Sequence, residues 1–283
     1  MPWPWCFPSR QGQPKTTKTS PPPSDETGLK LLYDGLAPKV DIVAVHGLGG
    51  HRENSWTAAN GVNWLRDLLP SDMLNTRVLS WGYSVPTREN SQQKISEQLV
   101  YDLWKLRSST YTANRPIIFI AHSLGGPLVK SALLYADSVQ EPHVLDVRSI
   151  KSSTHGVIFM GTPELDSRLL GLQSYLATAR DSEQESSDIY KEAQWLVTTL
   201  QSYPSISQEF WSLFVHERSD FMSTNITLDQ TASSPLQKSL SHICIQADHG
   251  GMIKFESSLD EGYLKIKEHL VCAAEVLEQE TDT

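Results

Sequence analysis

The chain has 283 residues, of which 39% are hydrophobic, and its formal net charge is −9. This length and apolar content are sufficient for one large domain with its own core. The acidic balance and the lack of a basic run argue against a nucleic-acid partner, because neutralising phosphates requires clustered Lys and Arg. The three cysteines cannot form a disulfide framework, which favours a reducing, intracellular compartment.

Residues 1–28 differ in composition from the rest of the chain, because they hold seven of the sixteen prolines, with Ser, Thr and Gln between them. Proline lacks the backbone N–H that helices and interior strands use, so this segment is predicted to be a disordered arm ahead of one domain at 29–283. The arm has no apolar run of signal-peptide length. Its aromatic residues around Cys6 leave two interpretations open, a peripheral membrane contact or a solvated tail, and we favour the tail.

Seven short segments rich in Val, Ile, Leu and Phe indicate β-strands. Continuous apolar runs that end at turn signals are typical of buried parallel strands, and they occur at 42–45, 117–121 and 157–160. Weaker strand candidates are 30–33, 77–81, 213–216 and 242–246.

Apolar residues recur at helical spacing between these strands. The pattern predicts helices at 95–106, 124–136, 189–200 and 266–277. Strands that alternate with helices predict an α/β fold, with a mostly parallel sheet covered by helices on both faces.

The sharpest chemical signal is Ser123, which lies between a predicted buried strand and a predicted helix. A serine becomes an exposed nucleophile when the turn from strand to helix is so tight that only small residues fit two positions before and after it. Here these positions hold Ala121 and Gly125. The start of the following helix directs backbone N–H groups at the site, which favours developing negative charge. We therefore interpret Ser123 as a nucleophile rather than as an idle residue in a glycine-rich turn.

A second glycine-rich turn, His46-Gly47-Leu48-Gly49-Gly50, follows an earlier predicted strand. Acyl transfer requires two N–H donors for the oxyanion, one after the nucleophile and one from such a turn. The backbone amides of Leu124 and Leu48 are our candidates. A phosphate-binding loop is the rival interpretation, but the turn lacks both the Gly-Lys-Ser/Thr sequence and the dinucleotide-binding spacing. His46 is interpreted as structural, because it precedes the serine turn in the chain.

The general base is expected late in the chain, because hydrolases built on such a sheet have the order Ser, acid, His. The late candidates are His216, His242, His249 and His269. We favour His249, because it follows a predicted strand in a glycine turn from which it can reach Ser123. His269 is expected on the polar side of a helix.

The acid of the triad is less well defined by the sequence. Glu217, at the end of a predicted strand, ranks first, ahead of Asp229 and Asp220. Asp248 is adjacent to His249 in sequence, which is poor geometry for orienting the ring. An acid at this position would fix the tautomer of the base and stabilise its protonated form.

Several motifs in fixed order support a family resemblance. They lie at 46–50, 64–65, 80–83, 121–126, 161–163 and 248–255. Over about residues 30–275 the chain resembles the serine-active-site-containing esterase family, a lipase-like branch of the α/β-hydrolases that fungal proteins carry ahead of NACHT or ankyrin modules. The resemblance implies an α/β-hydrolase fold and carboxylic-ester hydrolysis by Ser123, His249 and an acid. It supports Glu217, although the family's usual Tyr after Phe214 is absent, and Gly250 is smaller than usual.

The leading hypothesis is a serine esterase that needs no cofactor or metal and acts on a small-molecule or lipid ester. An acyltransferase or thioesterase with the same triad, and a non-catalytic binding module on a hydrolase scaffold, are the alternatives. Residues 169–176 are apolar enough to line an acyl pocket, or to pack in the core. The family's locations suggest a cytoplasmic protein or one held at the surface of mitochondrial or endoplasmic reticulum membranes.

Overall fold

The computed structural model describes residues 26–87, 90–139, 146–164, 188–217 and 240–281. The arm predicted at 1–28 therefore lies outside the described residues as far as residue 25. At the end of the predicted arm, the Arg52 guanidinium donates a hydrogen bond to the Thr27 carbonyl (2.9 Å), and the first strand begins at Gly28. The first strand thus includes Gly28, the last residue of the predicted arm.

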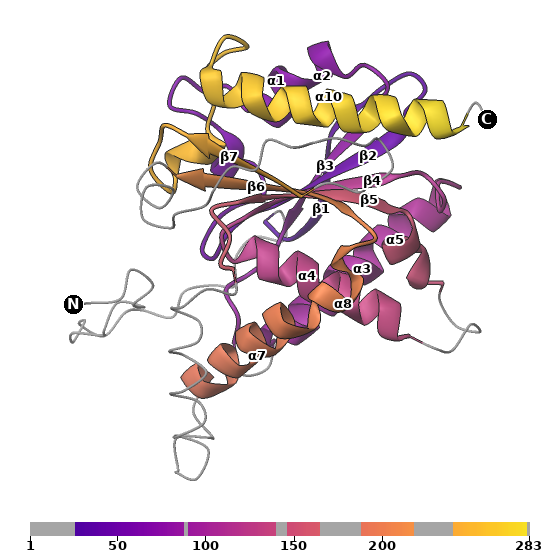
Figure 1. Ribbon diagram of the computed structural model, residues 1–283, viewed down its shortest axis with the longest axis vertical. Coiled ribbons are helices and arrows are strands. Elements are labelled where there is room, and N and C mark those ends of the chain that lie inside the picture. The colour runs from indigo at the N-terminus through magenta and orange to yellow at the C-terminus, as the bar shows by residue number, and fades with distance from the viewer. Residues whose placement is uncertain (1–25, 88–89, 140–145, 165–187, 218–239, 282–283) are drawn as a thin grey trace.

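A seven-stranded sheet with the order β1-β3-β2-β4-β5-β6-β7 forms the centre of the molecule (Figure 1). The strands are β1 (Gly28–Asp34), β2 (Val40–Val45), β3 (Thr76–Gly82), β4 (Ile117–His122), β5 (Thr154–Met160), β6 (Trp211–Glu217) and β7 (Leu240–Ile245). β1 is antiparallel to β3, whereas all the other neighbouring strands are parallel. This order, with one antiparallel edge strand, is that of the α/β-hydrolase fold, and the fold prediction is confirmed.

Helices cover both faces of the sheet (Figure 1). One face carries α1 (Trp64–Asp67), α2 (Leu69–Asp72) and α10 (Glu261–Thr281). The other carries α3 (Gln92–Ser109), α4 (Gly125–Ser138), α5 (Arg148–Ser152), α7 (Asp188–Ser202) and α8 (Pro204–Ser207). The short 3₁₀ helices are η1 (Asn54–Trp56) and η3 (Gly251–Ile253). No helix of the described residues is long and apolar enough to cross a membrane.

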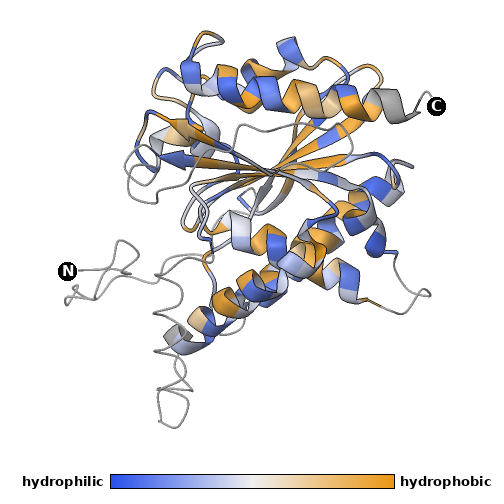
Figure 2. Ribbon diagram, in the orientation of Figure 1, coloured by the Kyte–Doolittle hydropathy of each residue, from blue (hydrophilic) through white to orange (hydrophobic). Residues whose placement is uncertain are grey.

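The central strands β2 and β4 are buried at every position, which explains their continuous hydrophobic runs. In Figure 2 the strands at the centre of the sheet are mostly orange. Side chains alternate along β2, so Val43 belongs to the cluster under α3 and α4, whereas Ile42 belongs to the cluster under α10. Phe119 and Ile118 divide in the same way on β4. β2 and β4 are adjacent and fully buried, so the turns that follow them start from a rigid base.

Candidate active site

Ser123 lies in the turn between β4 and α4, at the carboxyl edge of the sheet. Its backbone has φ 51°, in the left-handed region that side chains other than glycine rarely adopt. The Ser123 N–H donates to the Met160 carbonyl (2.9 Å), and the Ser123 carbonyl accepts from the N–H of Gly126 (3.1 Å). Neighbouring structure thus holds this strained conformation in place, as in functional turns of other proteins.

Two glycines allow the turn after β2 to approach Ser123 closely. A Cβ on Gly47 would lie 2.9 Å from the Ser123 Cβ. A Cβ on Gly125 would lie 2.6 Å from the carbonyl oxygens of Val45 and His46, both of which are backbone atoms. The small residue expected two positions after Ser123 is therefore required by the packing of α4 against the end of β2.

The backbone amides of Leu48 and Leu124 belong to the two turns that approach each other here. Leu48 follows Gly47, and Leu124 is the residue before the first turn of α4. Neither amide donates to an acceptor among the residues that the structure describes. Free backbone amides can stabilise an anion, and for Leu124 the start of α4 adds to this effect. This is the chemistry expected of the two amides.

His46 is held between its neighbours and is fully buried. The Tyr83 N–H donates to His46 Nε2 (3.3 Å), and His46 Nδ1 lies 2.7 Å from the Gly47 carbonyl. Because Nε2 accepts, the proton lies on Nδ1 and is donated to Gly47. Burial lowers the pKa of His46 to about 4. This neutral, fixed imidazole, stacked on Tyr83 at 4.5 Å, agrees with the structural role expected for it.

His249 and Glu217 come together from the ends of neighbouring strands β7 and β6. His249 Nδ1 lies 3.6 Å from Glu217 Oε1. The His249 side chain is 37% exposed, so the imidazole remains accessible to a substrate. Asp248 is occupied otherwise, because its Oδ1 accepts from the N–H of Gly251 (2.7 Å). The alternative acids Asp220 and Asp229 lie outside the described residues.

Contacts with the ends of β4 and β5 fix the His249 loop beside the serine turn. His122 Nε2 lies 2.9 Å from the His249 carbonyl oxygen, and the two ring centroids are 4.7 Å apart. Gly161 has φ 56°, and a Cβ there would lie 2.9 Å from His249 Nδ1. His122, the residue before Ser123, is therefore part of the site, although the sequence did not single it out.

His122 is buried, and burial together with the nearby His249 lowers its pKa to about 4. It is therefore neutral near pH 7. Because a carbonyl oxygen can only accept, His122 Nε2 carries the proton and donates it to His249. The contact joins the turn that holds the serine to the loop that holds the imidazole.

The other late histidines have different partners. His216 Nε2 lies 2.9 Å from His242 Nδ1, and the two rings stack. His269 Nδ1 lies 2.9 Å from the Lys265 carbonyl of its own helix, and its ring stacks on Trp211. His269, expected on the polar side of its helix, is thus half-buried, with its ring against Trp211 of β6. The apolar segment 169–176 lies outside the described residues, and within those residues no three His, Cys, Asp or Glu form a metal-binding group.

Comparisons with known proteins were made for sequence and for fold. No protein-family model matches the chain. Protein SERAC1 of Danio rerio is 30% identical over 150 residues, which cover 44% of this chain and 22% of that protein. Protein SERAC1 of Homo sapiens is 28% identical over 156 residues, which cover 46% of this chain and 22% of that protein. The chain therefore spans less than a quarter of the curated relatives that it matches.

Solved structures of lipolytic enzymes are similar to the chain at low sequence identity. A hormone-sensitive lipase from a metagenome library has a TM-score of 0.49 and 15% identity, covering 88% of this chain and 86% of that one. A structure from a study of the metagenome-derived lipolytic enzymes LipS and LipT has a TM-score of 0.47 and 9% identity, covering 88% of this chain and 98% of that one. The distant similarity to SERAC1 proteins agrees with the resemblance seen in the motifs of the chain.

Proposed function

We propose that this chain is a serine hydrolase that cleaves a carboxylic ester through an acyl-enzyme, with Ser123 as nucleophile, His249 as base and Glu217 as acid. The observation that carries the proposal is the left-handed backbone of Ser123 between β4 and α4. Such strain is stable only where the surroundings impose it, and here it lifts a hydroxyl to the edge where His249 also lies.

In the proposed reaction, His249 Nε2 accepts the proton of Ser123 Oγ as that oxygen attacks the ester carbonyl. The amides of Leu48 and Leu124 stabilise the negative charge on the carbonyl oxygen. Protonated His249 then donates its proton to the leaving alcohol, and a water molecule attacks the acyl-enzyme with His249 again as base.

Glu217 would orient the base in this reaction. Its Oε1 is 3.6 Å from His249 Nδ1, slightly longer than a hydrogen bond. Catalytic hydrogen bonds are often long without substrate and shorten in the complex. In that complex Glu217 would accept the Nδ1 proton, leaving Nε2 free to face Ser123.

The test of the nucleophile is Ser123→Ala, assayed with a chain-length series of p-nitrophenyl esters and with a fluorophosphonate probe. We expect turnover to fall by about 10⁴-fold or more, and covalent labelling to be lost. Ser109→Ala, at the remote end of α3, is the matched control and should keep both ester turnover and covalent labelling. Labelling that persists in the Ser123→Ala protein would exclude Ser123 as the nucleophile.

Two further measurements separate the alternatives. Glu217→Asn, Asp220→Asn and Asp229→Asn identify the acid, because only the true one should cost about 10²- to 10⁴-fold in kcat. Product analysis with a competing alcohol distinguishes a hydrolase, which releases the free acid, from an acyltransferase, which forms a new ester. A folded wild-type chain without turnover or labelling would instead indicate a binding module.

A further inference from the structure

A second cluster of charged groups lies at the opposite, amino edge of the sheet, and the proposed reaction does not use it. Asp41, at the start of β2, is fully buried and receives hydrogen bonds from three guanidinium groups. Arg77 binds both carboxylate oxygens, at 2.9 and 2.7 Å. Arg107 donates to Oδ2 at 2.5 Å, and Arg115 donates to Oδ1 at 3.0 Å.

The charges of this cluster do not balance. Arginine stays protonated in proteins, so three guanidinium groups around one carboxylate leave a formal excess of two positive charges. No other carboxylate pairs with any of the three arginines among the described residues. The exposed fractions are 6% for the Arg77 side chain, 1% for Arg107 and 17% for Arg115. Positive charge with so little water around it favours a bound anion.

The hydrogen bonds show which arginine can receive that anion. Each oxygen of Asp41 already accepts two hydrogen bonds, which is the capacity of a carboxylate. Arg77 also donates to the hydroxyls of Thr110 and Thr112. Arg107 also donates to two backbone carbonyls of the loop before β4. Within the described residues, Nε and Nη2 of Arg115 have no acceptor, and Arg115 is the most exposed of the three.

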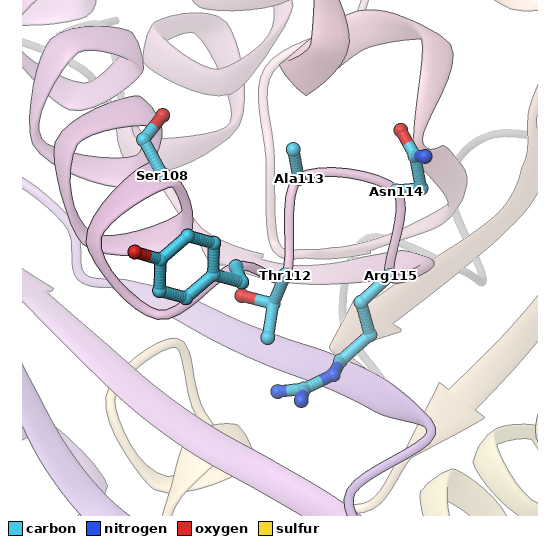
Figure 3. A pocket seen from close by; sticks show the side chains of 6 residues that line it. Ser108, Thr112, Ala113, Asn114 and Arg115 are labelled. Atoms are coloured by element: carbon cyan, nitrogen blue, oxygen red, sulfur yellow. The ribbon is translucent and has the colours of Figure 1, made fainter.

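Arg115 lines two cavities. One, of about 410 Å³, has six lining residues, none of them acidic: Ser108, Tyr111, Thr112, Ala113, Asn114 and Arg115. The other, of about 530 Å³, is also lined by Lys39 and by residues of the C-terminal half of α10. In Figure 3 the side chains of Thr112 and Arg115 leave the loop on the side of the strands, whereas Ser108 and Asn114 point the other way. Arg115 and Thr112 therefore lie on the same side of this loop, and both line the smaller cavity.

We propose that this smaller cavity binds a phosphate group, with the free Nε and Nη2 of Arg115 as a two-pronged donor and Thr112 as a neighbouring hydroxyl. A guanidinium fork matches two phosphate oxygens, and a dianionic phosphate balances the excess charge of the cluster. This phosphate site is separate from the proposed hydrolase active site, because the two lie at opposite ends of the strands. The phosphate is either free or part of a lipid headgroup.

The experiment titrates inorganic phosphate against the full chain by calorimetry and by thermal unfolding, with sodium chloride adjusted to constant ionic strength. Arg115→Gln removes the charge and the fork, and Arg115→Lys removes the fork alone. Lys254→Gln makes the same charge change at an exposed position on the opposite edge and is the control. We expect phosphate affinity to fall about tenfold or more in Arg115→Gln, to fall less in Arg115→Lys, and to be unchanged in Lys254→Gln.

Folding is checked by circular dichroism, and Thr112→Val serves as a second variant that keeps all three arginines. Vesicles of phosphatidylcholine with and without phosphatidic acid show whether the bound phosphate group is free or belongs to a lipid headgroup. Binding of the phosphatidic acid vesicles that depends on Arg115 indicates a headgroup, and phosphate binding without vesicle binding indicates a free ligand. Equal phosphate affinity in the wild type and Arg115→Gln, or no response to phosphate in the wild type, would overturn the proposal.

Discussion

At the scale of single residues, His122 links the two turns from which the proposed triad is built. Its Nε2–H donates to the His249 carbonyl at 2.9 Å, although it has no proposed part in proton transfer. The contact joins residues that are far apart in the chain, and a hydrogen bond from a side chain to a distant backbone leaves no local sequence pattern. This explains why the sequence predicted Ser123 and His249 as site residues but did not predict His122, whose side chain connects their two turns.

His122→Phe should test this positioning role. Loss of the hydrogen bond frees the His249 loop, and a small displacement of a reacting group lowers kcat, here by roughly 10- to 100-fold. His122→Gln should restore most of the rate, because the Gln Nε2 can donate in the same direction. Ester kinetics and urea unfolding of both variants are the measurements. Equal kcat in the Phe variant and the wild type would contradict the role.

The two buried histidines should also make the stability depend on pH. The pKa values of His46 and His122 are lowered from 6.5 to about 4, chiefly by burial. Between these values the unfolded chain binds protons that the folded chain does not. The stabilisation is therefore complete above about pH 6.5 and is lost as the pH falls toward 4, by about 3 kcal/mol for each histidine.

Urea unfolding between pH 4.5 and 7 measures this effect. In the wild type, the free energy of unfolding should fall steadily as the pH is lowered from 7 to 4.5. His122→Gln should have a shallower dependence, reduced by about one bound proton. The same slope in both proteins would show that His122 is not held neutral by the fold.

At the scale of elements, the junction of β4 and α4 depends on the absence of a side chain at Gly125. A Cβ there would lie 2.6 Å from the carbonyl oxygens of Val45, the last residue of β2, and of His46, the next residue. Both residues are fully buried, so these backbone atoms cannot easily move. Gly125→Ala should therefore lower the free energy of unfolding by about 2–3 kcal/mol. Gly250→Ala is the matched control, because its Cβ would meet nothing within 4 Å. Urea unfolding that gives equal losses for both would contradict this packing argument.

The elements themselves were predictable to different degrees. β2, β4 and β5 were predicted closely, because a strand buried on both faces is a continuous apolar run. The helices α1, α2, α5 and α8 were not predicted, since four or five residues are too few to display a helical period. α10 begins earlier than its apolar pattern, at Glu261, because the Asp260 carboxylate accepts from the N–H of Gly262 (2.8 Å).

The acid illustrates a limit of the sequence at the site itself. The strand pattern ranked Glu217 first because it ends β6, and the structure puts its carboxylate near His249. Chain order alone could not choose among three carboxylates, since order says nothing about which side chain reaches the ring. The Asp41 cluster could not be predicted from the sequence either, because its members come from four separate segments: β2, β3, α3 and the loop before β4.

At the scale of the whole molecule, Asp41 connects these four segments through one carboxylate. Asp41→Asn would leave three guanidinium groups without a counter-charge, so the free energy of unfolding should fall by about 3–5 kcal/mol. Asp67→Asn is the control, because Asp67 pairs with Arg66 at the surface, where such a pair contributes at most about 1 kcal/mol. Urea denaturation of the two variants compares the losses. A loss no larger for Asp41→Asn than for Asp67→Asn would show that the cluster does not stabilise the fold.

The order of the strands has a consequence for the way the chain folds. The proposed triad draws on β4, β6 and β7, and β7 joins the sheet at the far edge from β1, late in the sequence. β6 must pair with β5 across the long connection between Met160 and Trp211. Such pairing is slow, because loop closure costs entropy before any contact forms. In refolding experiments, secondary structure should therefore recover before the fluorophosphonate-reactive serine does. That probe would report the last step of folding, the docking of the β6–β7 edge.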